Sequence, residues 1–170
     1  MKVKVKKLLA ILCGVIMVYN SCIGMIVHAE ENIEILTISG YQELTGDYIG
    51  HGIFDIPGNI GEKAATLTDC TLAISVNANG VIGSMTTGST VTASKIGVEN
   101  VKVEKYVDGK WTLVGSSTGG YTTNNNYYAA TVTTSSAEKN VLYRVSCTHY
   151  AYLNGVRHEL NNVTNGVKYS

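Results

Sequence analysis

Three dipeptides that favour tight hairpin turns, each flanked by alternating apolar residues, constrain this chain more than any other feature. They are Asn79-Gly80, Asp108-Gly109 and Asn154-Gly155. Such pairs supply the two positive-φ positions of a type I′ turn, which joins two antiparallel strands. After residue 30 no stretch keeps the apolar spacing of a capped helix for several turns, and Pro57 is the only proline. The sequence therefore predicts an all-β domain.

Alternation and turn residues together predict about seven antiparallel strands. Gly115–Asn126 is rich in Gly, Ser, Thr and Asn and is predicted as a polar loop. Strands of this number and spacing favour a single-domain β-sandwich, immunoglobulin-like in broad architecture only, because Trp111 and Tyr143 do not have the antibody-type spacing from the cysteines. The predicted strands are Cys70–Val76, Val81–Ala93, Val98–Val107, Lys110–Val114, Tyr127–Thr134, Leu142–Leu153 and Val156–Val163.

The N-terminus has the pattern of a secretory signal. Four lysines precede an apolar stretch, and Val27-His28-Ala29 offers small residues for cleavage after Ala29. An uncleaved membrane anchor is the alternative, because the stretch is long enough to span a bilayer. Residues 1–29 are therefore predicted as a signal peptide, 30–69 as a partly irregular arm and 70–170 as the sandwich, in a secreted, extracellular protein with no stable anchor after cleavage.

Within the arm, the short alternating segment Ile33–Ile38 is either a peripheral strand or part of a flexible lead. Gly46–Gly61 has too many glycines for regular structure, and Gly61–Thr68 offers a short helical turn. The arm is thus expected to be partly irregular.

Charge excludes one class of partner. The chain has 13 basic and 13 acidic residues, and four of the lysines lie in the predicted signal, so the mature part carries 9 against 13, a net charge of −4. A nucleic-acid partner requires a clustered basic face, which this balance does not indicate.

Three separated motifs give the chain a resemblance. Lys105 to Trp111, the strand Tyr143-Arg144-Val145 running into Thr148-His149, and the closing Thr164-Asn165-Gly166 occur in this order. In these motifs, over roughly residues 46 to 170, the chain resembles a family of short secreted proteins from Gram-positive bacteria that is known only as a domain of unknown function. The resemblance implies a small extracellular β-domain and no particular activity.

Enzymatic activity is not predicted, and neither is a cofactor. Gly115 to Gly119 matches the Gly-x-Ser-x-Gly pattern of hydrolases, but the residues that follow cannot form the helix which that nucleophile requires. The carboxylates are scattered over predicted solvent faces, whereas a glycosidase needs a matched pair.

Two histidines and two cysteines carry the remaining chemistry. With Asn154-Gly155 as the turn, Cys147, His149 and His158 share one face of the last hairpin, so a metal ion is conceivable there, although a fourth ligand is missing. Cys70 and Cys147 are the two cysteines outside the signal and both lie on apolar faces, which predicts a disulfide in an exported domain. A buried free thiol or a zinc ligand are the alternatives for Cys147.

Tyrosines gather near the polar loop and the last hairpin. Tyr127, Tyr128, Tyr150 and Tyr152 are candidates for a ligand-binding surface, since Tyr beside Ser, Gly and Asn is typical of adaptable binding surfaces. The alternative is that these rings pack in half-buried strands. Tyr150 and Tyr152 share the strand face opposite Cys147 and are predicted to be exposed.

The sequence as a whole predicts a secreted, non-enzymatic β-domain that binds an extracellular ligand, either a glycan or a protein. A small metal-binding protein or enzyme that uses His149 and His158 is the alternative.

Overall fold

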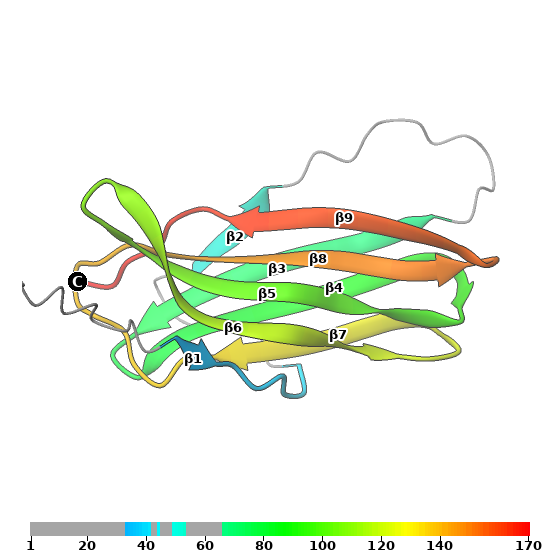
Figure 1. Ribbon diagram of the computed structural model, residues 1–170, viewed down its shortest axis with the longest axis horizontal. Coiled ribbons are helices and arrows are strands. Elements are labelled where there is room, and N and C mark those ends of the chain that lie inside the picture. Colours follow the sequence, from blue (N-terminus) through cyan, green and yellow to red (C-terminus); the bar gives the residue numbers. More distant parts are fainter. Residues whose placement is uncertain (1–32, 42–43, 45–48, 54–65) are drawn as a thin grey trace, which may run out of the picture. The chain divides into compact units, whose positions relative to one another are not determined.

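The computed structural model describes residues 33–41, 44, 49–53 and 66–170, and within them the chain forms nine β-strands (Figure 1). These residues contain no helix that is long and apolar enough to cross a membrane. The predicted signal peptide, residues 1–29, lies outside the described part. The strands are β1 (Glu34–Ile35), β2 (Ile49–Ile53), β3 (Leu67–Asn77), β4 (Gly80–Ala93), β5 (Lys95–Val107), β6 (Lys110–Thr122), β7 (Asn125–Thr133), β8 (Tyr143–Leu153) and β9 (Val156–Thr164).

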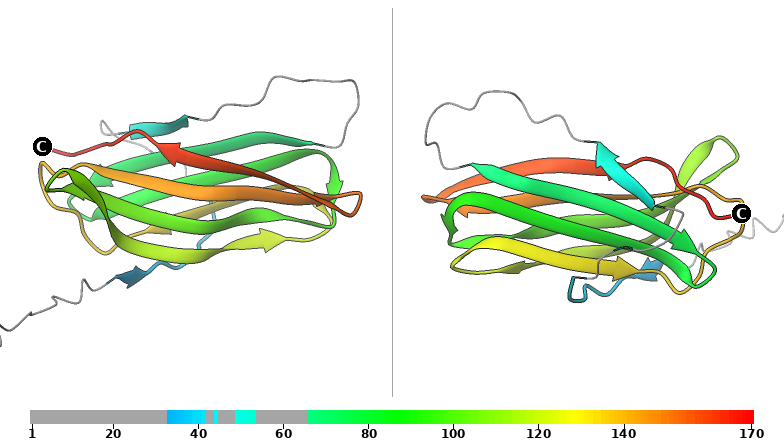
Figure 2. Two further views of the ribbon diagram at one scale, coloured as in Figure 1. Left: turned by 45° about the horizontal axis from the view of Figure 1, so that its top comes forward. Right: turned by 180° about the vertical axis from the view of Figure 1, so that it is seen from behind.

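Two sheets pack face to face, which confirms the predicted β-sandwich (Figures 1 and 2). The five-stranded sheet has the order β1-β6-β5-β8-β9, and its pairings are antiparallel except for the short parallel pairing of β1 with β6. The three-stranded sheet has the order β3-β4-β7 and is antiparallel. At one seam between the sheets, β2 pairs first with β3 and then with β9.

The other seam is covered by residues 33–39, which we name the N-terminal strap. β1 pairs with β6 at Gly115 and Ser116, and Ser39 forms an antiparallel bridge with Thr131 of β7. Between these contacts Leu36 inserts its side chain into the core, where it is buried. Ile33–Ile38 is therefore a peripheral strand rather than a free lead, and it joins the edges of both sheets.

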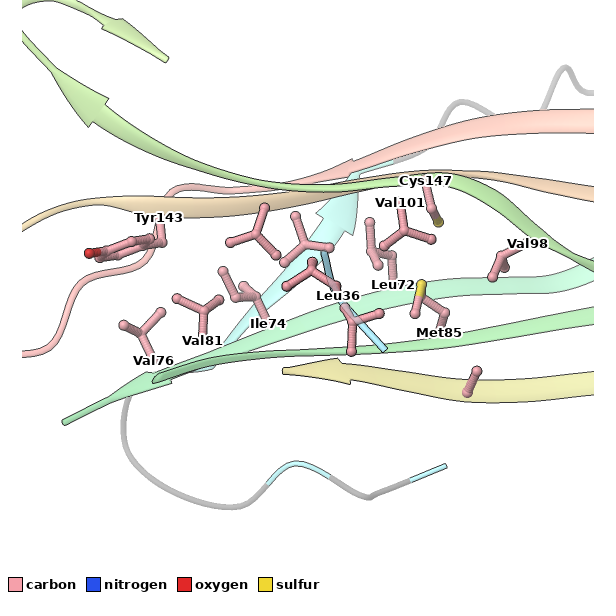
Figure 3. Close-up of a cluster of buried hydrophobic side chains, with 14 residues drawn as sticks. Leu36, Leu72, Ile74, Val76, Val81, Met85, Val98, Val101, Tyr143 and Cys147 are labelled. Carbon is pink, nitrogen blue, oxygen red and sulfur yellow. The ribbon is translucent and has the colours of Figure 1, made fainter. Parts of the chain in front are cut away.

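The core lies between the sheets and is built from the alternate residues that face inward (Figure 3). On β3, the face predicted from alternation is buried throughout. Figure 3 shows Leu36 among side chains from both sheets. The buried cluster consists of Leu36, Leu72, Ile74, Val76, Val81, Met85, Val98, Val101, Val103, Ala130, Val132, Tyr143, Val145 and Cys147.

Two of the three predicted turns have the expected geometry. Asp108 and Gly109 have φ values of 50° and 81°, and Asn154 and Gly155 have 51° and 81°, so both pairs are the positive-φ positions of a type I′ turn. The predicted turn at Asn79-Gly80 is wrong. The loop residues are Ala78 and Asn79, and Gly80 already pairs with Asn77. The Asn77 side chain accepts a hydrogen bond from the Asn79 N–H and holds this turn from the strand end.

The predicted polar loop at 115–126 is also wrong, since β6 runs unbroken to Thr122. Residues 115–122 pair with β5, and β1 of the N-terminal strap pairs with Gly115 and Ser116 at the other edge of β6. The arm contributes β1 and β2 to the sheets, and Leu67 and Thr68 open β3 instead of ending a helical turn. The rest of the predicted helical turn, and most of the glycine-rich segment, lie outside the described residues.

Candidate functional site

The outward face of the five-stranded sheet carries a row of polar and aromatic side chains. On β8, Cys147, His149 and Ala151 face the core, so Thr148 and Tyr150 point the other way. β5 and β9 flank β8 in this sheet, and β6 lies beyond β5. Side chains from four strands therefore meet on one surface.

Tyr150 lies at the centre of this face and is covered by its neighbours. Its direct partner on β5 is Gly97, which has no side chain, and its partner on β9 is Glu159. The Arg157 guanidinium carbon is 4.9 Å from the centre of the Tyr150 ring, and Lys95 Nζ is 5.5 Å from it. The ring is only 3% exposed, so the prediction that Tyr150 is open to solvent is wrong.

Tyr121 and Tyr152 extend the aromatic surface on either side of Tyr150. The Tyr150 and Tyr152 ring centroids are 6.3 Å apart in an edge-to-face arrangement. Tyr121, on β6, is 57% exposed, and Lys95 Nζ lies 3.9 Å from its ring centroid. Such contacts between a cation and a ring face hold both groups in place. We name Lys95, Tyr121, Tyr150, Tyr152 and Arg157 the tyrosine–cation strip.

Two arginines form ion pairs with the carboxylates of this face. Arg157 pairs with Glu99 at 2.6 Å and with Glu159 at 2.9 Å. Hydrogen bonds to Glu99, Tyr152 and Glu159 raise the pKa of Arg157 above its usual range. Arg144 pairs with Glu104 at 2.8 Å. Each acidic side chain that faces outward here is thus held by an arginine.

Next to the strip lies an open polar hollow with a volume of about 410 Å³. It forms where β5 carries one extra residue between Glu99 and Lys102 relative to β8, and Asn100 takes a φ of 54° within this bulge. A bulge of this kind breaks the ladder and re-aims the neighbouring side chains. The hollow is lined by Asn100, Lys102, Ser146, Cys147, Thr148, Asn161, Asn162 and Val163.

Most of the residues that line the hollow have side chains that can form hydrogen bonds. The Thr148 hydroxyl donates to Asn161 Oδ1 at 2.7 Å, which fixes the amide on the outer face. The Lys102 side chain is exposed, and no carboxylate in the described residues pairs with Lys102 or with Lys95. The volume and lining suit a polar ligand of modest size, since ligand sites combine a concave surface with a few fixed polar groups.

The four predicted tyrosines do not share a surface. Tyr150 and Tyr152 lie on the outer face of the five-stranded sheet, whereas Tyr128 is partly buried against the core between the sheets. Tyr127 points away from the core on β7, on the opposite side of the sandwich, and is 47% exposed. The structure brings Tyr150 and Tyr152 together with Tyr121, which the predicted surface did not include.

A second polar group is buried between the sheets around His149. Thr87 Oγ1 lies 2.8 Å from His149 Nδ1, and Thr87 donates to the Gly97 carbonyl, so we assign the Nδ1–H as donor to Thr87. Nε2 is then an acceptor, with Cys147 Sγ and Asn162 Nδ2 each 3.5 Å away. The Asn162 amide also donates to the Cys70 carbonyl at 3.2 Å.

Burial keeps this group neutral. It lowers the pKa of His149 to about 4 and, with a smaller contribution from Cys70, raises the pKa of Cys147 to about 12. A nucleophilic cysteine requires the thiolate form and an accessible sulfur. The contact between Cys147 and His149 is therefore a core hydrogen bond and does not supply an activated nucleophile.

The predicted Cys70–Cys147 disulfide is absent from the structure, in which both residues are buried free thiols. The Cys147 sulfur faces His149, while the Cys70 sulfur donates to the Thr68 carbonyl within the bulge of β3. Each sulfur is thus engaged with a different partner.

The predicted metal candidates, His149 and His158, sit in different surroundings. The hairpin register matches the prediction, with His149 opposite Leu160 and His158 opposite Ala151. Both nitrogens of His149 contact protein groups, and His158 is half-buried near the strand end. Within residues 33–41, 44, 49–53 and 66–170, no group of three or more His, Cys, Asp or Glu residues is placed to hold a metal ion.

The sequence analysis missed Lys95, Arg157 and the hollow, and it left Tyr121 out of the candidate surface although this tyrosine belongs to the same group in the sequence. Arg157 could have been found, because the predicted register of the last hairpin places it directly opposite Tyr152. Placing Lys95 and Tyr121 on this face required knowledge of the pairing of β5 with β6 and β8, which no local signal specifies.

Comparison with known proteins gives no relative. Neither a known protein family nor a curated protein nor a solved structure matches this chain.

Proposed function

We propose that the protein is a secreted, non-enzymatic binding module that holds an extracellular glycan on the outer face of its five-stranded sheet. The observation that carries this proposal is the polar hollow beside the tyrosine–cation strip. Hydroxyl and amide groups in the hollow match the hydrogen-bonding needs of sugar hydroxyls. The exposed ring of Tyr121 at the strip suits the apolar face of a sugar ring, which packs on flat aromatic groups.

The export pattern at residues 1–29 supports a location outside the cell. The Cys147–His149 contact is buried and neutral, so this pair does not favour a catalytic role. The ligand-facing groups also lie on paired strands and not on long loops, which gives a surface that is formed before the ligand arrives.

Tyr121→Ser and Tyr127→Ser form a matched pair that tests this proposal. Both rings are exposed, at 57% and 47%, but only Tyr121 lies on the proposed face. Either substitution should leave folding nearly intact, since exposed changes usually cost less than about 0.5 kcal/mol. We expect Tyr121→Ser to weaken binding roughly tenfold, the loss typical of removing an aromatic contact residue.

Binding is measured by affinity electrophoresis of the chain without residues 1–29 in gels containing purified polysaccharides, and by co-sedimentation with insoluble cell walls. Retardation that Tyr121→Ser relieves and Tyr127→Ser does not would support the proposal. Equal effects of the two substitutions, or cell-wall binding that glycosidase treatment does not change and protease treatment abolishes, would contradict it. The second result would indicate a protein ligand.

A further inference from the structure

We propose that the glycan is an acidic polysaccharide, whose anionic groups are met by Lys102 in the hollow and Lys95 in the tyrosine–cation strip. This inference rests on the proposed function and names the ligand class for the same face. On the outer face the arginines pair with the glutamates, whereas Lys95 and Lys102 have no carboxylate partner among the described residues.

The outer face has a positive excess in a domain that is otherwise acidic. Arg157 with Glu99 and Glu159 carries a charge of −1, and the Arg144–Glu104 pair is neutral. Lys95 and Lys102 add +2, so the sum over these seven side chains is +1. The mature chain as a whole carries −4 by the count given above. The two lysines thus stand out against an acidic background, and the face complements an anion.

Lys102 has the surroundings of an anion-binding group. None of the eight residues that line the hollow is acidic. The neighbouring Asn100 and Asn161 are exposed amides, and amide N–H groups donate hydrogen bonds to carboxylate or sulfate oxygens. A lysine that is not tied to a carboxylate keeps its three donors for the ligand.

Lys95 is held in position without losing its charge. The ring faces of Tyr121 and Tyr150 fix the ammonium at 3.9 Å and 5.5 Å from their centroids. Aromatic rings attract a cation without neutralising it, so the site remains positive. A sugar carboxylate that binds Lys95 would place its ring against the exposed Tyr121.

The separation of the two lysines indicates a chain ligand. Lys95 and Lys102 lie seven residues apart on β5, which corresponds to roughly 20 Å at the rise of a strand. A monosaccharide cannot span that distance, whereas several linked units can. The ligand inferred here is therefore a linear polymer with repeated anionic groups. These groups can be carboxylates or sulfates, because the ammonium group of lysine binds either anion without a bidentate geometry.

The experiment uses three polymer probes: polygalacturonate, dextran sulfate and uncharged dextran. Binding to polygalacturonate or dextran sulfate should weaken steadily as salt rises, because exposed ionic contacts are screened. Each of Lys102→Gln and Lys95→Gln should weaken it roughly tenfold, the loss expected for a charge-assisted hydrogen bond. Polygalacturonate and dextran sulfate distinguish a carboxylate ligand from a sulfate ester.

The matched control is the double substitution Lys139→Gln with Lys168→Gln, which removes two exposed charges at the other end of the sandwich. It should leave binding unchanged, and thermal unfolding should show that all variants are folded. Binding to dextran that equals binding to the acidic polymers and does not respond to salt would overturn this inference while leaving a glycan-binding module in place. Absence of binding to both acidic polymers at low salt would overturn it as well. Loss of cell-wall binding in Tyr127→Ser and Tyr121→Ser alike would instead contradict the proposed function.

Discussion

His149 is a histidine that the fold holds uncharged. It is fully buried, its Nδ1 is paired with Thr87, and its Nε2 faces a thiol and an amide nitrogen. No carboxylate is hydrogen-bonded to the ring among the described residues, so nothing offsets the cost of charging it. Asn162 Oδ1, in the same cluster, is buried without a hydrogen-bond partner in the described part of the chain.

We expect the free energy of unfolding to fall when the pH drops from 6.5 towards 4. Burial lowers the pKa of His149 from 6.5 to about 4 in the folded protein, so in this window the unfolded chain takes up the proton first. The stabilisation is complete above pH 6.5 and is lost through the window, by about 3 kcal/mol. Urea unfolding across this range measures it.

His149→Gln is the control for this loss, because its side chain cannot be protonated. Carboxylates also titrate near the lower end of the window, but they do so in both proteins. The difference between the two proteins should therefore shrink as the pH falls. A constant difference would show that His149 is not the group responsible.

At the scale of elements, the hairpin turns were the part of the fold that residue types determine most directly. The register of β8 with β9 follows from Asn154-Gly155 and the alternation of the two strands, and the structure has it residue for residue. The same reasoning failed at Asn79-Gly80, where Gly80 is the first residue of β4. Its φ of 139° brings it against the Thr134 carbonyl, a contact with a distant loop that no dipeptide preference contains.

Gly109→Ala should lower the free energy of unfolding by about 1 kcal/mol. Gly109 has a φ of 81°, and a Cβ there would meet no atom within 4 Å, so the cost is that of the left-handed backbone alone. Gly80→Ala should cost more, since the added Cβ would collide with the Thr134 carbonyl as well. Denaturant unfolding ranks the two variants. No measurable loss in Gly109→Ala would mean that the turn is misplaced, and the reverse order would contradict the close approach of Gly80 to the Thr134 carbonyl.

The candidate face was less predictable than the strands because it depends on pairings between distant elements. Alternation on β8 correctly set Tyr150 and Tyr152 opposite Cys147. It could not show that Gly97 leaves room above β5, or that Lys95 and Arg157 would cover the Tyr150 ring. The bulge at Asn100 did have a signal in the sequence, because the buried valines shift from Val98 to Val101 across one extra residue and Asn tolerates a positive φ. The sequence analysis did not use this signal.

At the scale of the whole sandwich, the N-terminal strap makes the two sheets into a nearly continuous surface. β2 links β3 with β9 at one seam, and the strap links β6 with β7 at the other. Exposed strand edges invite pairing with other chains, and covering them is a common protection. Gly115 allows this closure, because a Cβ there would lie 2.7 Å from Leu36 Cδ2.

Leu36→Ala should lower the free energy of unfolding by about 3 kcal/mol, the usual cost of emptying a buried leucine site. Ile35→Ala is the matched control: the neighbouring side chain is 89% exposed, and its loss should cost less than about 0.5 kcal/mol. Thermal or denaturant unfolding compares the two. Similar values for both would mean that the strap does not hold Leu36 in the core.

The position of the strap in the chain also sets an order of events during folding. Ser39 and Thr131, which bond to each other across the seam, are 92 residues apart. The strap is synthesised before β6 and β7. Its docking sites on these two strands form only after the strands have paired with their neighbours. Contacts of such long range form slowly. The first described residues of the chain are therefore among the last to find their partners, and until they do so the edges of β6 and β7 are open to other chains.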